Sequence, residues 1–167
     1  YDYQPTDKIS KIEVTLPDMI VGMKSYSPEG LKVTAYAGDE ISDGITFPTN
    51  TKYWNNFGYL ESEGAAPMTF SSEKIEKGKY QYTYRLELDK RSGYQFADDV
   101  DIYVNGSTEN VEITSRYDSE INIRYYYPVG TQPKSSIEEA TIGAIQNQTY
   151  TGKKIEPAVA VQDEGTP

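Results

Sequence analysis

Apolar and polar residues alternate along several short stretches of the chain. In the stretch 12–16, Ile12, Val14 and Leu16 are separated by polar residues, and in the stretch 80–88 tyrosine and leucine occupy every second position. A period of two is typical of a β-strand that buries one face. On this basis we predict strands at 12–16, 31–35, 80–88, 100–104, 111–113 and 121–127.

Residues that favour turns separate these predicted strands. They are Ser27 to Gly30, Asp43-Gly44, Glu63-Gly64, Lys77-Gly78, Ser92-Gly93 and Asn105-Gly106. The Asn-Gly pair after Val104 predicts a hairpin turn, because both residues tolerate positive φ. No window of about eleven residues or more has the 3.6-residue period of an amphipathic helix. We therefore predict an all-β fold with almost no helix, built as a β-sandwich or a barrel.

The alternation stops in a segment rich in proline, glycine and serine, which is typical of a linker. We predict an N-terminal tail at 1–8, a β-sandwich at 9–129, a linker at 130–136 and an incomplete second domain at 137–167. The last part contains two predicted strands, at 137–145 and 155–161. About thirty residues with two strands cannot bury a core alone, so this part is either a fragment of a second domain or an appendage docked on the first.

The amino-acid composition removes many classes of catalyst. The 167 residues include no histidine and no cysteine. The chain therefore lacks an imidazole that can act as a base near neutral pH, and it lacks a thiolate nucleophile or soft metal ligand. No Gly-x-Ser-x-Gly motif is present, and nothing selects a catalytic pair among the 26 acidic residues. We expect a protein that is not an enzyme and that needs no cofactor.

The charge and hydropathy of the chain argue against two kinds of partner. With 16 basic and 26 acidic residues, the net charge is −10, which repels nucleic-acid phosphates and anionic lipid head groups. No apolar run approaches the roughly 20 residues that a membrane-spanning helix needs. We expect no nucleic-acid binding and no membrane insertion.

Residues 150–161 read Tyr-Thr-Gly-Lys-Lys-Ile-Glu-Pro-Ala-Val-Ala-Val. This stretch is similar to the Y-T-G-K-x-I-x-P-x-V-x-V opening of the Ig-like repeat modules of secreted and cell-surface proteins of Gram-positive bacteria. Residues 93–96 and 100–106 resemble the later half of a related module. The resemblance implies an Ig-like antiparallel β-sandwich, followed by a short linker and the first strands of a second Ig-like repeat. It also implies tandem arrangement, location outside the cell or in the cell wall, and no shared catalytic residues.

The expected function follows from this resemblance and from the composition. We expect a non-enzymatic spacer or presentation module of a secreted or surface-anchored bacterial protein. Its expected partners are the neighbouring domains of the same polypeptide.

A dense aromatic segment favours a different function. It consists of Tyr53, Trp54, Asn55, Asn56, Phe57 and Tyr59. Aromatic rings stack on sugar faces, and amides bond to hydroxyl groups. The alternative function is thus a carbohydrate-binding or adhesive module whose partner is a glycan or a host or matrix protein. Against this, Ig-like sandwiches commonly bury one tryptophan, and Trp54 is the only candidate.

Other tyrosines and acidic residues offer weaker candidates. Tyr36, Tyr103 and Tyr126 lie on the polar sides of their predicted strands and would form an exposed platform if those strands adjoined in one sheet. Tyr94 resembles a tyrosine corner, which places it in the core. The two acidic clusters are Asp98, Asp99 and Asp101, and Asp39, Glu40 and Asp43. Neither has the spacing of an EF-hand loop, so we expect solvated turns and no metal site.

Overall fold

The computed structural model of the chain describes residues 7–26, 29–41, 45–46, 55–91, 93–136, 140–142, 149, 152, 154 and 161–163. Every regular element among these residues is a β-strand, which confirms the predicted all-β class. The chain divides into two units, Tyr1–Pro133 and Lys134–Pro167, which are described separately.

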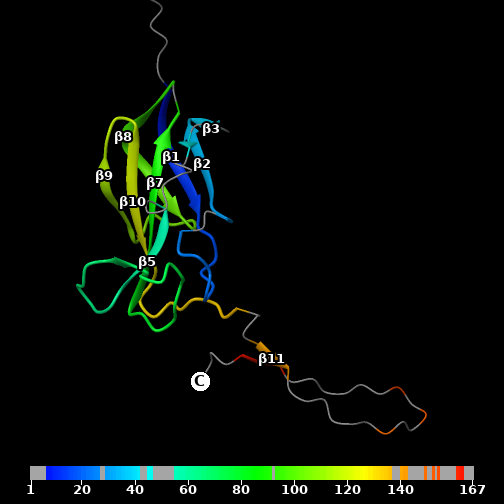
Figure 1. Cartoon of the computed structure of the whole chain (residues 1–167). Coiled ribbons are helices and arrows are strands. Elements are labelled where there is room, and N and C mark those ends of the chain that lie inside the picture. The colour runs from blue at the N-terminus through cyan, green and yellow to red at the C-terminus, as the bar shows by residue number, and fades with distance from the viewer. Residues whose placement is uncertain are drawn as a thin grey trace, which may run out of the picture. The chain divides into compact units, whose positions relative to one another are not determined.

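The first sheet of the first unit is built around the N-terminal strand. Its order is β3 (Asp39–Ile41), β2 (Lys32–Ala37), β1 (Asp7–Thr15) and β8 (Tyr94–Val104). Strands β1 and β2 are antiparallel, whereas β1 and β8 are parallel (Figure 1). The expectation of a purely antiparallel sandwich is therefore wrong for this sheet, because the N-terminal strand inserts beside β8 in the same direction.

The second sheet is antiparallel. Its order is β6 (Met68–Thr69), β5 (Asn56–Leu60), β7 (Gln81–Lys90), β10 (Glu120–Tyr126) and β9 (Val111–Arg116). The short strand β4 (Ile45–Thr46) also pairs with β7, near the end of β7 that β5 does not reach. Strand β7 is thus the centre of the sheet, with β10 along its other edge.

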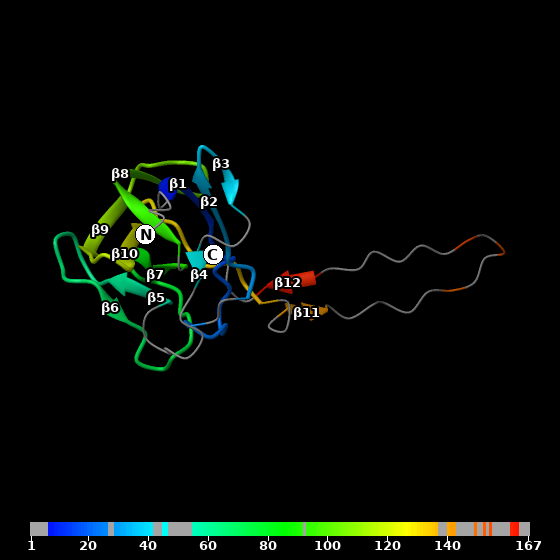
Figure 2. The ribbon, with the colours of Figure 1, turned by 90° about the horizontal axis from the view of Figure 1, so that it is seen from above.

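The core lies between the two sheets, which Figure 2 shows as opposing layers. The largest fully buried side chains come from both sheets and include Ile9, Ile12, Phe57, Tyr82, Tyr84, Leu86, Leu88, Ile121 and Ile123. The buried residues of β7 and β10 in this set occupy alternate positions, as expected when one face of a strand is buried. In β1, Ile9 and Ile12 are three positions apart, across the irregularity in the pairing with β8. The molecule is therefore a two-layer β-sandwich in this unit.

Some apolar side chains are less buried than the alternating pattern predicts. Tyr80 is only half-buried and precedes β7. Ile113 is 43% exposed on the edge strand β9, where a register shift interrupts the pairing with β10. Tyr94 is half-buried and packs against the core without being enclosed by it. Periodicity identifies the strand in these cases but not how far its apolar face is covered.

The predicted Asn105-Gly106 turn is present, and it has a second role. Both residues have positive φ, 50° and 85°, and the turn joins Val104 to Ser107. It is not a hairpin between two long strands, because β9 lies in the other sheet. The Asn105 backbone N–H donates to the Val14 carbonyl over 2.8 Å, and its side-chain oxygen accepts from the Leu16 N–H over 3.0 Å. The turn therefore fixes the end of β1.

The parallel pairing of β1 and β8 is interrupted by an irregularity. Ile9 pairs with Phe96, but Lys11 pairs with Asp101, so β8 contains extra residues between these points. The Arg116 guanidinium from β9 donates to the Ala97 and Asp98 carbonyls in this bulge. One arginine thereby satisfies backbone acceptors of the first sheet from the edge of the second.

In the second unit, the described residues contain one antiparallel pair. Strand β11 (Ala140–Ile142) pairs with β12 (Val161–Asp163), with Ala140 opposite Asp163. The division between the units follows Pro133, within the segment 130–136 that the sequence predicts as a linker. Most of the stretch 150–161, which resembles an Ig-like repeat, lies outside the described residues.

Candidate functional site

The outer side of the second sheet carries a concentrated set of charged and amide groups. Alternate residues of β7 fill the core, so the residues between them face away from the first sheet. The ladder between β7 and β10 places Asp89 opposite Glu120, Glu87 opposite Asn122 and Arg85 opposite Arg124. We call these six residues the β7–β10 polar face.

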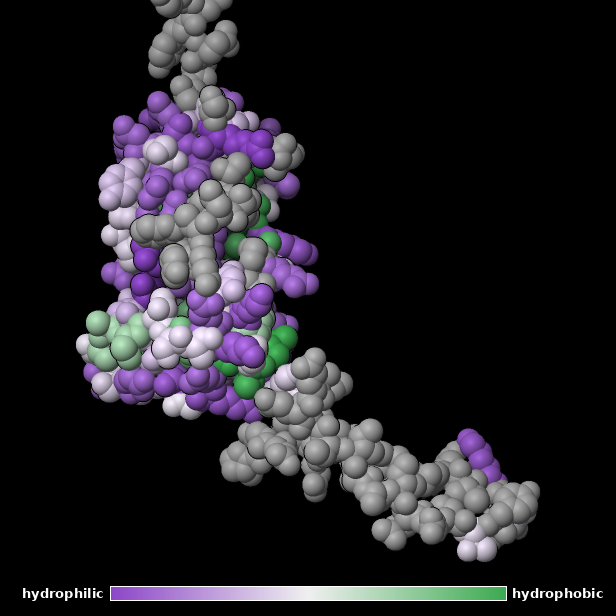
Figure 3. All heavy atoms as spheres, in the orientation of Figure 1, coloured by the Kyte–Doolittle hydropathy of each residue, from purple (hydrophilic) through white to green (hydrophobic). Residues whose placement is uncertain are grey.

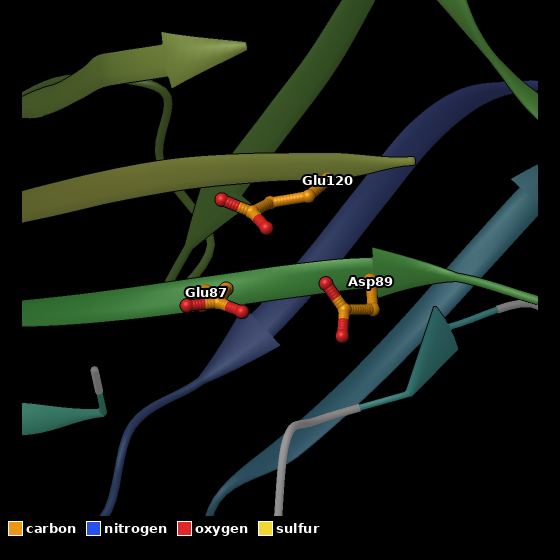
Figure 4. Close-up of side chains that lie close together, drawn as sticks. All are labelled: Glu87, Asp89 and Glu120. Carbon is orange, nitrogen blue, oxygen red and sulfur yellow. The ribbon is translucent and has the colours of Figure 1, made fainter. Parts of the chain in front are cut away.

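Three carboxylates meet on this face. One oxygen from each of Glu87, Asp89 and Glu120 lies within 4.8 Å of the others. Figure 4 shows all three on the same side of β7 and β10. Burial and the charges of Glu120 and Asp89 raise the pKa of Glu87, and burial and Glu120 raise the pKa of Asp89. The cluster therefore brings together one buried carboxylate, that of Glu87, and two half-buried ones.

The amide of Asn122 borders the carboxylates and is only 3% exposed. Its Nδ2 donates to Glu120 Oε1 over 2.6 Å and to Ser115 Oγ over 2.9 Å. Among the residues that the structure describes, nothing donates to its Oδ1. The face therefore includes a buried oxygen acceptor beside the acidic cluster.

Two arginines lie in the next row of the sheet. Arg124 Nη1 donates to Thr83 Oγ1 over 3.4 Å. Burial and the positive charge of Arg124 lower the pKa of Arg85, while Glu87 acts in the opposite direction. The polar face thus has carboxylates in two rows and guanidinium groups in the third, an arrangement that can orient a polar partner.

The aromatic segment from Tyr53 to Tyr59 is only partly described. Tyr53 and Trp54 lie outside the described residues, and Asn55, Asn56 and Phe57 are buried. Their roles are structural where contacts are known: Asn55 Oδ1 accepts from the Glu87 N–H over 2.9 Å, and the Phe57 ring lies 4.5 Å from Tyr84.

The remaining member of that segment, Tyr59, is half-buried. Its ring lies 4.8 Å from the Phe70 ring, and Lys79 Nζ lies 4.3 Å from its centroid. A glycan site in this segment stays a prediction.

The three outward tyrosines do not share one surface. Tyr36 and Tyr103 lie in the first sheet on either side of β1, and Tyr126 lies in the second. Lys11 Nζ lies 4.3 Å from the Tyr36 ring centroid and 5.7 Å from that of Tyr103. The Tyr126 hydroxyl donates to Glu112 over 2.8 Å. The three tyrosines therefore do not form the predicted platform. Only Tyr36 and Tyr103 lie near each other, with the Lys11 ammonium group close to both rings.

The acidic cluster of the structure differs from both clusters considered in the sequence. Asp98, Asp99 and Asp101 are exposed along β8, Asp39 and Glu40 are exposed in β3, and Asp43 lies outside the described residues. Part of the cluster is visible in the sequence, because Glu87 and Asp89 occupy outward positions of one strand. Glu120, however, joins them only through the pairing of β10 with β7.

The described surface also has two hollows. One, of about 480 Å³, is lined by residues that include Lys8, Lys90, Phe96, Arg116 and Tyr117. The other, of about 720 Å³, is lined by residues that include Pro17, Ile20 and Met23. Figure 3 shows that most of the visible surface is hydrophilic, with a few apolar residues toward the lower end of the sandwich. Neither hollow contains the carboxylate cluster.

None of the described residues forms a helix that is long and apolar enough to cross a membrane. Searches of protein families, of curated proteins and of solved structures found no match to the chain.

Proposed function

We propose that this chain is a non-enzymatic structural module that spaces or presents neighbouring domains of a secreted or surface-anchored bacterial protein. The observation that carries the proposal is the path of the chain through the first unit. The chain enters the sandwich at one end and leaves it at the other, so that the sandwich itself adds length between its neighbours.

The entry and exit points follow from the strand registers. Asp7, at the start of β1, pairs with Tyr94, and Tyr94 follows the turn after Lys90, the last residue of β7. At the exit, the Tyr127 N–H donates to the Tyr82 carbonyl near the start of β7. The 10 residues of β7 lie between these points, and at about 3.3 Å per residue they span about 30 Å.

The position of β1 suits a chain under tension. Strand β1 lies between β2 and β8, with Ile9, Ile12 and Val14 buried in the core. A pull on Asp7 along the strand loads the hydrogen bonds to both neighbours in shear, so many bonds resist together instead of opening one at a time. Such an arrangement supports a load-bearing role.

Sequence features support the rest of the proposal. The absence of histidine and cysteine removes the commonest catalytic side chains. The resemblance of residues 150–161 to an Ig-like repeat supports a second module after the first, and with it an extracellular, tandem arrangement. Charged residues on the short edge strand β3, Asp39 and Glu40, discourage pairing between edges of separate molecules.

Force spectroscopy tests this function. The chain is pulled first through its two ends, which shears β1, and then through the N-terminus and a cysteine at Arg91→Cys. Both attachment points of the second pull lie at one end of the sandwich. That pull therefore opens the hydrogen bonds between β1 and β8 one at a time. The chain has no natural cysteine, so the attachment is unique.

We expect clearly higher unfolding forces for the end-to-end pull than for the unzipping pull. Equal, low forces in both geometries would contradict a load-bearing spacer.

A further inference from the structure

The hollow of about 480 Å³ lies at the end of the sandwich where β1 begins, and both sheets border it. Lys8 of β1 and Phe96 of β8 come from the first sheet, whereas Lys90 at the end of β7 and Arg116 at the end of β9 come from the second. We call it the basic hollow. Its volume lies within the range of about 300–1,000 Å³ that is typical of small-molecule sites. Because paired strands supply most of its wall, the hollow is formed before a ligand arrives.

Three cationic side chains line the basic hollow, although acidic residues outnumber basic ones by 26 to 16 in the whole chain. They are Lys8, Lys90 and Arg116. None of the three forms an ion pair with a carboxylate among the described residues. Like charges that gather without paired counter-charges repel one another. An anionic group in the hollow would relieve this repulsion.

Arg116 is held in position by the backbone of the first sheet. Its Nη1 donates to the Asp98 carbonyl over 2.9 Å, and its Nη2 donates to the Ala97 carbonyl. A guanidinium has five N–H donors, and these bonds use two of them. Because a carbonyl group has no net charge, the positive charge of Arg116 is fixed in place but not neutralised. A cation that is already ordered loses little conformational freedom when it binds an anion.

The other polar residues of the hollow restrict the kind of anion that fits. Asp98 and Asp118 place two carboxylates in the same hollow as the cations. These carboxylates repel a multiply charged anion, as does the net charge of −10 on the chain. They accept hydrogen bonds from hydroxyl groups, however, and the Gln95 amide both donates and accepts. The lining therefore suits a ligand with a single negative charge and several hydroxyl groups.

Tyr117 adds an aromatic surface to the hollow. Its side chain is 62% exposed and lies in the turn between β9 and β10. The Tyr117 N–H donates to the Glu120 carbonyl over 2.8 Å, so the backbone that carries the ring is fixed by the turn. A flat, exposed ring can stack on the apolar face of a sugar while its hydroxyl stays in water.

We propose that the basic hollow binds a hexuronic acid residue of an acidic polysaccharide. Such a sugar has one carboxylate, several hydroxyl groups and an apolar ring face. Lys90 and Arg116 bind the carboxylate, whereas Gln95 and Asp118 bond to the hydroxyl groups. Tyr117 covers one face of the ring. The site goes beyond the spacer function and does not depend on it, and none of the described residues of the aromatic segment 53–59 lines it.

An NMR titration of the whole chain with trigalacturonate, a linear trimer of galacturonic acid, tests the site. The backbone amides of residues 90, 95, 117 and 118 should shift along one saturation curve. Maltotriose, a neutral trimer, should bind at least about tenfold more weakly, because it lacks the carboxylates that bond to the cations. No saturable shift with trigalacturonate overturns the proposal, and so does equal binding of maltotriose. Equal or tighter binding of inorganic phosphate overturns the assignment to a sugar.

Matched variants separate this site from general attraction to lysines. Lys90→Gln removes one charge from the hollow and should weaken trigalacturonate binding about tenfold. Lys8→Gln is a second charge variant if Lys90→Gln folds poorly. Lys32→Gln, at an exposed position that pairs with Thr15 at the far end of β1, changes the net charge equally and should bind as the wild type does.

Tyr117→Ala tests the stacking ring. Because this side chain is largely exposed, the variant should fold normally, and it should weaken binding of trigalacturonate several-fold. Wild-type affinity in Tyr117→Ala and in both charge variants of the hollow overturns the proposal. An equal loss of affinity in Lys32→Gln and Lys90→Gln overturns it as well, because binding would then depend only on the net charge.

Discussion

At the scale of single residues, the tyrosines of the core differ in whether their hydroxyls are satisfied. The Tyr82 hydroxyl donates to the Glu76 carbonyl over 2.6 Å. The Tyr84 and Tyr127 hydroxyls are buried and have no partner among the described residues. Burial raises the pKa of both. The tyrosine hydroxyl therefore stabilises the fold at Tyr82 and destabilises it at Tyr84 and Tyr127.

This difference predicts opposite effects of the same substitution. Tyr84→Phe keeps the ring contact with Phe57 and removes an unsatisfied hydroxyl, so we expect the free energy of unfolding to rise by about 1 kcal/mol. The matched control Tyr82→Phe loses a hydrogen bond and should lower it by about 1 kcal/mol. Urea denaturation measures both. A loss of stability in Tyr84→Phe would mean that its hydroxyl is bonded in solution.

The polar side of the first sheet predicts a dependence on pH. Lys11 Nζ lies 2.7 Å from Glu13, and the Tyr36 hydroxyl donates to Glu13 over 2.9 Å. These two contacts lower the pKa of Glu13. Because the folded-state pKa is the lower one, this contribution to stability is present above the unfolded pKa and is lost as the pH falls through the folded value.

An NMR titration of the Glu13 carboxyl group measures that pKa directly. It should lie below the ordinary glutamate value, and Tyr36→Phe should move it upward by removing one of the two hydrogen bonds. An unchanged pKa in the variant would show that the hydroxyl contact does not persist in solution.

At the scale of elements, Asn105 connects the turn after β8 to the end of β1. Asn105→Ala removes the acceptor for the Leu16 N–H and places alanine at a positive φ of 50°. We expect a loss of about 1–3 kcal/mol in the free energy of unfolding. Asn105→Asp retains an oxygen acceptor and tolerates positive φ, so it should lose less. Equal losses in thermal or urea unfolding would contradict this role.

The sequence predicts most elements of the sandwich but little of their pairing. Alternation locates β7 and β10 because their buried residues, such as Leu86 and Ile123, fall at every second position. It cannot select a partner, since partners lie far apart in the chain. Periodicity therefore does not predict the parallel contact of β1 with β8.

The same limit applies to the candidate site. Glu87 and Asp89 are visible as outward residues of one strand, but Glu120 joins them only through the register of β10. The burial of Glu87 and the unpaired oxygen of Asn122 are tertiary properties, and strand periodicity contains no information about them.

At the scale of the whole molecule, the first unit carries the chain from one end of a two-layer sandwich to the other. Strand β1 begins beside the turn that follows β7, and the chain leaves beside the start of β7. A spacer needs this separation, because a module whose ends lie together adds little to the reach of a polypeptide.

A distance measurement between spin labels tests this claim most directly. Labels at Lys8→Cys and Val129→Cys lie near the entry and the exit of the sandwich. Double electron–electron resonance should give a separation of about 30 Å between them, which is the length of β7. The control pair, Lys8→Cys and Arg91→Cys, lies at one end and should give a much shorter distance. Equal short distances for both pairs would contradict the account.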